Sequence, residues 1–351
     1  MSAGFEGPVA VTGASGYVAS HVVRELLQRG ATVHATVRNP GDAAKVAHLT
    51  KAAEGAPGTL KLFAADLLSE GSFAEALAGC VAVIHTASPF LITSIKDPQK
   101  DLVDPALLGT RNVLNQCSKT PSVRRVVLTS SVVAMYDGPS DAAAKGRPLN
   151  DTDWNETSSL TNNPYGYSKT VAEREAWTLA KAQSQWHLVV VNPGFVMGPS
   201  LTPRNDSASI DFLLGLINGK FSSGMWEFYT AWVDVRDVAT AHVEAALRAD
   251  AEGRHPLVSD NAGIWAAIEL LRADFGSKLK LPGRRIPKWA AYLAAPFMGM
   301  TWGYVTKTVD VVFSIDGSRA TERLGLTYRP LRDTLHDHVE QVIRDGLYKP
   351  S

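Results

Sequence analysis

Short apolar runs alternate with amphipathic segments through the first half of the chain. The apolar runs predict strands, each followed by a polar or glycine-containing turn, at 9–12, 31–37, 60–65, 81–85, 125–129 and 187–191. Apolar residues between them recur at helical spacing and predict helices over 17–29, 42–54 and 101–117, from residue 69, and over 163–184. Strands that alternate with helices and are almost continuously apolar predict an α/β fold whose parallel sheet is covered on both faces.

The alternation stops after Gly198. Beyond it the pattern predicts a loop over 199–205, a helix over 210–217, a short strand at 232–235 and a helix through Leu247. The most apolar late stretch runs from Trp289 to Trp302, but Pro296 interrupts it. This stretch is too short to span a bilayer, so it favours a buried helix pair.

Composition places the chain among ordinary globular proteins, with 45% hydrophobic and 20% charged residues. Lys plus Arg and Asp plus Glu number 35 each, which gives no indication of a nucleic-acid or membrane partner. Cys80 and Cys117 form no metal-type cluster, and so few cysteines suit a reducing compartment. The first strand begins directly after Pro8, which leaves no room for a signal peptide. We therefore expect a cytoplasmic protein without a metal.

A glycine-rich turn joins the first predicted strand to the first helix, in the sequence Val9 to Ala19. Gly13 and Gly16 lack the β-carbons that would obstruct a tight turn and the approach of a phosphate. The free amides of the helix that follows, together with its dipole, favour an anion. Such turns end many strands, but at the start of an alternating pattern this one predicts a Rossmann-type, doubly wound sheet that binds a dinucleotide.

The end of the second predicted strand bears on the choice of dinucleotide. NAD-binding versions of this fold carry an acidic residue there, whereas this chain has Arg38. An arginine pairs with a 2′-phosphate, and Lys45 could add a second positive charge, so we expect NADPH/NADP+. Arg38 could equally be an exposed strand-end cation. Asp66, after the third strand, is placed to meet the adenine amino group or to cap its own loop.

The candidate catalytic groups follow the fifth strand and open the helix over 163–184. Tyr165 and Lys169 stand four residues apart, so they share one helical face. A lysine ammonium and the positive charge of the nicotinamide would favour the phenolate form of Tyr165. Lowering the pKa of this tyrosine to near 7 would require about 4 kcal/mol of stabilisation of the phenolate. Tyr165 would then protonate the carbonyl oxygen of the substrate during reduction, and a serine hydroxyl would donate a hydrogen bond to the same oxygen. Ser130 and Ser131 point to opposite faces of their strand, so only one can do this.

These motifs together resemble the extended short-chain dehydrogenase/reductases. The segments 12–19, 129–131, 165–169 and 232–239 carry this resemblance, and 35–40 and 191–199 resemble the branch of dihydroflavonol, cinnamoyl-CoA and aldehyde reductases. The resemblance implies NADPH-dependent reduction of aldehydes or ketones, with Ser131, Tyr165 and Lys169 as the catalytic triad. Dihydroflavonol reductases often have asparagine five residues after the serine, where this chain has Tyr136, so no flavonoid substrate is implied.

The expected domains are a cofactor-binding domain over 1–192, to which a segment near 228–250 returns, and a mainly substrate-binding region over 193–351. The expected cofactor-binding residues lie at the strand ends and on the catalytic helix: Thr12, Gly13, Ser15, Gly16, Tyr17, Val18, Arg38, Lys45, Asp66, Leu67, Thr86, Ala87, Ser88, Thr129, Tyr165, Lys169, Pro193, Gly194 and Val196. The candidates for an apolar substrate wall, which could equally be core residues, are Phe90, Tyr136, Phe195, Met225 and Trp226.

The leading hypothesis is an NADPH-dependent reductase of a small apolar or aromatic aldehyde or ketone, acting as a monomer or homodimer. A nucleotide-sugar epimerase or dehydratase would use the same fold and chemistry, but with NAD and with basic groups for a diphosphate. Arg38 argues against NAD. Basic groups for a diphosphate could come from Arg204, Arg284 and Arg285, so this requirement excludes the alternative only weakly. A non-enzymatic NADP-binding sensor would have a damaged catalytic set, and here the set is complete.

Overall fold

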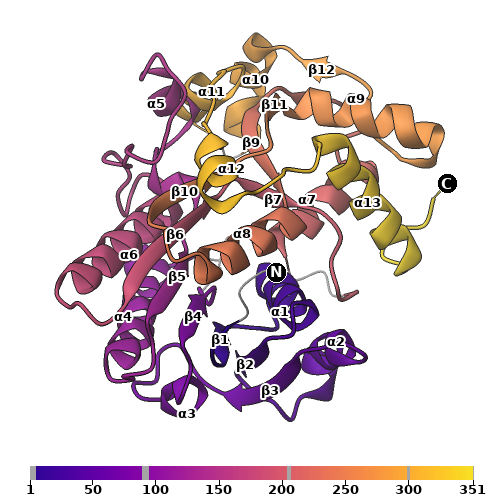
Figure 1. Ribbon diagram of the computed structural model, residues 1–351. Coiled ribbons are helices and arrows are strands. Elements are labelled where there is room, and N and C mark those ends of the chain that lie inside the picture. Colours follow the sequence, from indigo (N-terminus) through magenta and orange to yellow (C-terminus); the bar gives the residue numbers. More distant parts are fainter. Residues whose placement is uncertain (1–4, 89–94, 204–206, 299–300, 351) are drawn as a thin grey trace.

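A parallel sheet of seven strands forms the centre of the molecule, in a computed structural model that describes residues 5–88, 95–203, 207–298 and 301–350 (Figure 1). The strand order is β10-β6-β5-β4-β1-β2-β3. The strands are β1 Val9–Thr12, β2 Thr32–Val37, β3 Thr59–Ala64, β4 Ala82–His85, β5 Arg125–Thr129, β6 His187–Pro193 and β10 Gly253–Leu257. The chain order reverses between β1 and β4, where sheets of this kind bind their ligands. The predicted α/β fold is confirmed.

Helices cover both faces of this sheet and enclose a separate apolar core on each. One core joins the sheet to α1, α2 and α8, and the other joins it to α3, α4 and α6. Strand β1 serves both, since Val9 and Val11 belong to the first core and Ala10 to the second. These helices are α1 Tyr17–Gln28, α2 Ala43–Ala53, α3 Ala74–Leu77, α4 Asp104–Ser118, α6 Pro164–Lys181 and α8 Val235–Leu247.

The structure differs from the predicted elements in three places around this sheet. The helix expected from residue 69 is only the short α3, and the one expected over 101–117 begins as a π-helical turn, Gln99–Val103. The seventh strand, β10, was not predicted, because Arg254, His255 and Pro256 interrupt its apolar pattern. Among the described residues it pairs only with β6, and proline is tolerated at such an edge.

The later part of the chain builds a second, three-stranded sheet and its helices. Strand β9, Tyr229–Asp234, lies between β7, Phe195–Met197, and β11, Asp260–Gly263. An apolar core joins this sheet to α7 Ala208–Ile217, α9 Ile264–Phe275 and α13 Leu331–Arg344. Helix α8 follows β9 directly and packs against α1 of the first core. The domain boundary near residue 192 stays a prediction.

Short elements complete the fold. Strand β8 pairs with β12, and α12 adds residues to the core of the first sheet. Their bounds are η2 Val132–Ala134, α5 Pro139–Ala143, β8 Met225–Trp226, η3 Gly276–Lys278, β12 Arg285–Ile286, α10 Lys288–Ala294, η4 Ala295–Met298, α11 Trp302–Thr308 and α12 Ser318–Leu324.

The prediction that a helix pair over 289–302 is buried is wrong. Helices α10 and α11 do pair, but Trp289, Leu293 and Trp302 are each about two thirds exposed, and Phe297 is 92% exposed. The buried core of this contact consists of alanine and valine side chains, while Trp289, Leu293 and Phe297 stay outside it. Among the described residues, no helix combines the length and apolarity that crossing a membrane requires.

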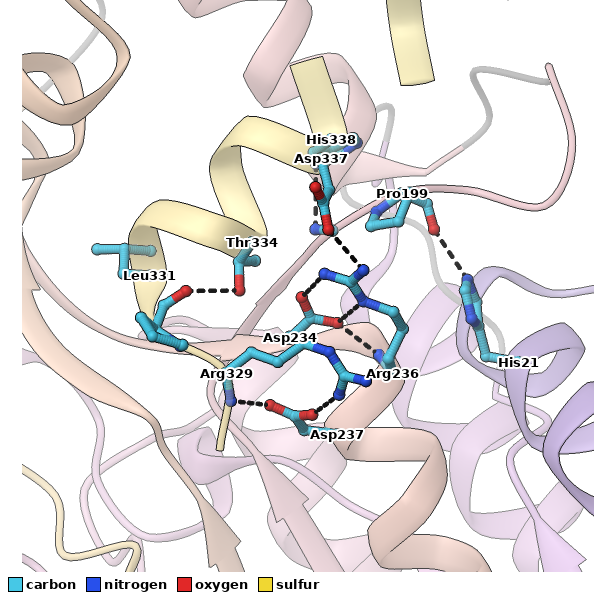
Figure 2. Close-up of polar contacts among 12 residues, drawn as sticks. His21, Pro199, Asp234, Arg236, Asp237, Arg329, Leu331, Thr334, Asp337 and His338 are labelled. Carbon is cyan, nitrogen blue, oxygen red and sulfur yellow. Dashed lines mark hydrogen bonds and ion pairs between the residues drawn. The ribbon is translucent and has the colours of Figure 1, made fainter. Parts of the chain in front are cut away.

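A partly buried polar network connects the C-terminal helix α13 to α8 and, through the loop after β7, to α1 (Figure 2). Arg236 at the start of α8 pairs with Asp234 at 2.6 Å and with Asp337 of α13 at 2.6 Å. His21 of α1 donates to a carbonyl of the loop after β7 at 2.8 Å, and His338 of α13 accepts from that loop at 3.2 Å. Burial would raise the pKa of Asp234, but the Arg236 guanidinium holds it below its usual value.

Candidate active site

The glycine turn between β1 and α1 requires glycine at position 13. Gly13 has φ +64°, and a β-carbon there would lie 3.0 Å from the β-carbon of Ala87. Gly16 begins α1 without a side-chain cap, and the first turn carries no acidic residue. The first-turn amides therefore remain available to an anion, as the sequence predicts.

Polar contacts hold the ends of β1 and β4 together beside this turn. The Thr12 hydroxyl lies 2.8 Å from His85 Nδ1 and accepts from the Ala87 amide at 3.1 Å, and the Thr86 hydroxyl donates to the Thr12 carbonyl. Burial and the Lys169 charge lower the pKa of His85 to about 3, so this ring is neutral. The sequence prediction included the two threonines and Ala87, but not His85.

The residues expected to read the adenosine half of the cofactor lie at the ends of β2 and β3. Arg38 is exposed and forms no ion pair within the described part of the chain. Lys45 is 65% exposed and pairs with Asp42 at 3.5 Å. Asp66 is exposed, and one of its carboxylate oxygens caps its own loop by accepting from the Leu68 amide at 2.8 Å. The structure thus leaves Arg38 open to a 2′-phosphate, and Asp66 does serve as a loop cap.

The start of α6 positions Tyr165 and Lys169. Asn163 adopts φ +53° and its side-chain oxygen caps the Gly166 amide at 3.0 Å, so the predicted helix start is confirmed. Lys169 Nζ donates to the Ser88 hydroxyl at 3.2 Å, which joins α6 to the segment after β4. A cavity of about 20 Å³, enough for one water molecule, lies against Lys169.

The protein's own groups shift the pKa values of the pair in opposite directions. Burial raises the pKa of Tyr165 above its usual value of 10. Burial lowers the pKa of Lys169 to about 8, and the Glu173 carboxylate opposes this shift. The expected tyrosine pKa near 7 is therefore not produced by the protein's groups alone, because burial shifts this pKa upward. A protonated tyrosine is the form that a proton donor needs.

The two neighbouring serines make different contacts. Ser130 is buried and donates to the Glu173 carboxylate at 2.6 Å. Ser131 is half-buried, and its hydroxyl donates to the Pro193 carbonyl at 3.4 Å and accepts from the Val133 amide at the same distance. Ser130 thus points into the interior and bonds to Glu173, as expected if neighbouring side chains alternate in direction. Ser131 stays the predicted catalytic serine.

The other expected cofactor residues lie along the same edge of the sheet. The Thr129 hydroxyl lies 2.6 Å from Nε2 of the buried His242. The Tyr17 hydroxyl donates to the Gly198 carbonyl at 2.5 Å. A β-carbon on Gly194 would lie 2.4 Å from a backbone oxygen of β9. Pro193 is buried, and the remaining residues are half-buried: Ser15, Val18, Leu67 and Val196. Their contacts with a cofactor stay predictions.

The expected substrate wall is mostly engaged in packing. Tyr136 is buried against an aromatic ring 5.1 Å away, and Phe195 contacts two aromatic rings. Met225 is buried in the core of the second sheet, and the half-buried Trp226 packs against the α10–α11 contact. Phe90 lies outside the described residues. A substrate role for these side chains stays a prediction.

Sequence reasoning missed a buried cluster of charged and polar side chains between α6 and the sheet. It consists of Glu173, Asn192 and Arg254, which come from α6, β6 and β10. A glutamate four residues after Lys169 shares its helical face, and this spacing could have signalled Glu173. Arg254 had no such signal, because its strand was itself not predicted. Among the described residues, no group of three or more His, Cys, Asp or Glu could hold a metal ion.

Comparison with known proteins gives a consistent result. Residues 9–258 match the model of the NAD dependent epimerase/dehydratase family. Cinnamoyl-CoA reductase CAD2 of Medicago truncatula is 42% identical over 95% of both chains. Tetraketide alpha-pyrone reductase 1 of Arabidopsis thaliana is 35% identical over 97% of both. The solved structure of yeast methylglyoxal/isovaleraldehyde reductase Gre2, complexed with NADPH, superposes with a TM-score of 0.79 at 26% identity, covering 97% of this chain and 99% of that one.

Proposed function

The chain belongs to the NAD dependent epimerase/dehydratase family, and we propose that it is an NADPH-dependent reductase of a small apolar or aromatic aldehyde or ketone. The curated relatives named above are reductases, and the yeast neighbour was solved with NADPH, which supports both the reaction class and the cofactor. The resemblance to extended short-chain dehydrogenase/reductases is confirmed. The observation that carries the proposal is that Lys169, one turn after Tyr165, reaches the end of β4 beside the glycine turn.

The residues present suit NADPH. The positive φ of Gly13 and the uncapped start of α1 suit a pyrophosphate. Arg38 is exposed and has no ion pair among the described residues, so it suits the 2′-phosphate. NADPH, when bound, supplies the hydride that the carbonyl carbon accepts. Lys169 would hold the nicotinamide ribose.

Three side chains carry the rest of the chemistry in this proposal. The protonated Tyr165 hydroxyl donates its proton to the carbonyl oxygen as negative charge develops there. The Ser131 hydroxyl donates a second hydrogen bond to that oxygen and fixes its position. The Lys169 ammonium lowers the cost of the tyrosinate that remains, and its own pKa near 8 keeps it mostly protonated at neutral pH.

The nucleotide-sugar alternative finds less support. Arg38 stands where an acidic residue would bind the ribose hydroxyls of NAD. Of the basic residues considered for a diphosphate, Arg285 is paired with Asp310 and Glu227, and Arg204 lies outside the described residues. Release of tightly bound NAD from the purified protein would support this alternative.

The test is a substrate panel followed by the loss of NADPH absorbance. The panel contains aryl aldehydes, diketones, β-keto esters and a cinnamoyl-CoA thioester, each with NADPH and with NADH. We expect turnover of at least one carbonyl compound with a preference for NADPH. Absence of turnover across the whole panel would overturn the proposal, whereas reduction of the thioester alone would correct its substrate class.

A further inference from the structure

Glu173 is an ionisable residue buried behind the proposed catalytic groups. It lies on α6, one turn beyond Lys169 and two turns beyond Tyr165, and its side chain is fully buried. Four residues donate to its carboxylate: Ser130 Oγ at 2.6 Å, Arg254 Nε at 2.6 Å, Asn192 Nδ2 at 2.9 Å and Trp177 Nε1 at 3.3 Å. All four groups are hydrogen-bond donors, as a buried carboxylate requires.

These donors join α6 to three adjacent strands. Ser130 directly follows β5, Asn192 is near the end of β6, and Arg254 belongs to β10. The Asn192 amide that donates to Glu173 also donates to the Ser131 carbonyl at 3.2 Å. Ser131 is therefore restrained twice, through the side chain of the preceding residue and through its own carbonyl oxygen.

Arg254 extends the cluster to the loop that leads into α6. Its guanidinium lies 4.0 Å from the ring centroid of Trp154, and it donates to the carbonyl oxygens of Asp151 and Asp153. A buried ion pair is often no more stabilising than apolar residues of the same volume, because both charges lose their hydration. Stability alone is thus a weak reason for a charged pair here, and its position behind the catalytic groups indicates another role.

We propose that Glu173 is a positioning residue of the active site, which holds the Ser131 segment against α6 and places a buried negative charge one helical turn from Lys169. This inference rests on the proposed reductase function. Ser131 lies in the segment after β5 and Lys169 lies on α6, and the Glu173 carboxylate connects the two through Ser130 and Asn192. Loss of the charge and loss of the hydrogen bonds should therefore have separate effects.

The electrostatic part depends on the groups that face Lys169 and Glu173. Lys169 faces Glu173 on its own helix and the neutral His85 from β4, and it donates to Ser88. Glu173 faces Arg254 from β10 and the uncharged donors Ser130, Asn192 and Trp177. Burial lowers the pKa of Lys169 to about 8 while Glu173 raises it. Without the carboxylate charge, Lys169 should lose its proton at lower pH.

The experiment compares Glu173→Gln with Glu173→Asp and Ser130→Ala in the full chain, using the panel member that the wild type reduces best. Glutamine removes the charge and keeps one oxygen, which can accept from Ser130 and Asn192 as Oε2 of Glu173 does. We expect the alkaline loss of kcat in Glu173→Gln to move to lower pH by roughly one unit. Glu173→Asp, which keeps the charge, should retain the wild-type midpoint.

Ser130→Ala separates positioning from charge, since it removes one donor to Glu173 and leaves both charges in place. We expect a several-fold lower kcat, an unchanged midpoint and an NADPH Kd equal to that of the wild type. A purely structural role for Glu173 would lower kcat equally at every pH. An unchanged midpoint in Glu173→Gln would overturn the charge effect, and a wild-type kcat in Ser130→Ala would overturn the positioning effect.

Failure of the proposed function can be distinguished from failure of this inference about Glu173. If the wild type reduces no member of the panel, the proposed function itself is wrong. If the wild type is active and the variants behave as a structural role predicts, only this inference is wrong. Should Glu173→Gln not fold, as judged by circular dichroism and thermal melting, Ser130→Ala and the midpoint of Glu173→Asp decide the outcome.

Discussion

Burial shifts the pKa values of Tyr165 and Lys169 in opposite directions because tyrosine is neutral, and lysine charged, when protonated. Desolvation thus keeps the proton on the phenol and makes the ammonium easier to deprotonate. Neither residue type nor spacing contains this information. The two side chains stand at the predicted spacing, but their environment decides which of them holds its proton more firmly.

Replacement of Tyr165 by phenylalanine tests the proposed proton donor. Phenylalanine keeps the ring and removes only the hydroxyl, so NADPH should bind as to the wild type. Turnover should fall by about 10²- to 10⁴-fold, the usual contribution of a general acid. Fluorescence titration with NADPH provides the binding control, and retained activity would remove Tyr165 from this role.

Arg38 is the residue on which cofactor preference should depend. Arg38→Asp replaces the cation with an acceptor for ribose hydroxyls, so kcat/KM for NADPH should fall by about 10- to 100-fold, while that for NADH should rise. The matched control is Lys51→Ala, because Lys51 is an exposed cation in the last turn of α2 and is not among the expected cofactor-binding residues. An unchanged ratio of the two cofactors in Arg38→Asp would show that the 2′-phosphate is bound elsewhere.

At the scale of elements, the start of α6 illustrates how a helix orients two catalytic candidates. Asn163 combines a left-handed backbone with a side-chain cap, and its amide also donates to the Asp137 carbonyl at 2.7 Å. The following proline suits the first helical position. The local sequence encodes this helix start, and the prediction of a cap followed by proline was confirmed.

Two substitutions at position 163 separate the cap from the backbone conformation. Asn163→Ala loses the cap and must adopt positive φ, so it should lower the free energy of unfolding by about 2–3 kcal/mol. Asn163→Gly loses the same side chain but tolerates the conformation, so its loss should be smaller. Urea unfolding at neutral pH measures both, and equal losses would contradict the contribution assigned to the backbone.

The pair α10–α11 marks the limit of prediction from apolar content. Its sequence is among the most apolar of the chain, yet Trp289, Leu293 and Phe297 are exposed. Periodicity identifies a helix and its apolar side chains, but it does not say whether another element covers them. Only the arrangement of neighbouring elements decides this, and here alanine and valine side chains form the buried core of the contact.

At the scale of the whole molecule, packing of the two sheets and their helices buries histidines from separate elements. Burial lowers the pKa values of His21, His85 and His338 to about 3, and those of His242 and His255 to about 4. An unfolded histidine has a pKa near 6.5, so the unfolded chain binds more protons between about pH 4 and 6.5. Stability should therefore fall as the pH drops through this range.

The free energy of unfolding from urea titrations at pH 7 and pH 5 tests this linkage. Each fully buried histidine can contribute a fall of up to about 2 kcal/mol. His338→Asn offers a matched variant, because an asparagine oxygen could accept from the Gly198 amide in place of Nδ1. The variant should lose less stability between the two pH values. An equal loss would mean that His338 does not titrate on unfolding.

The sequence alone determined what neighbouring residues encode. The six strands of the first half, the glycine turn of Gly13, the start of α6 and the spacing of Tyr165 and Lys169 all follow from local periodicity and backbone preference. The ends of several helices differ by a few residues, because capping and the π-helical turn before α4 depend on their surroundings. The family also followed from these local motifs.

The tertiary structure alone decided what depends on contacts between distant segments. It added β10 beside β6, and with it Arg254, whose partner Glu173 lies 81 residues away. It placed Ser130 in the interior and left Ser131 half-buried, raised the pKa of Tyr165, and exposed the apolar side chains of α10 and α11. The physical reason is the same in each case: burial and pairing belong to the packed arrangement of elements, and no local stretch of sequence specifies them.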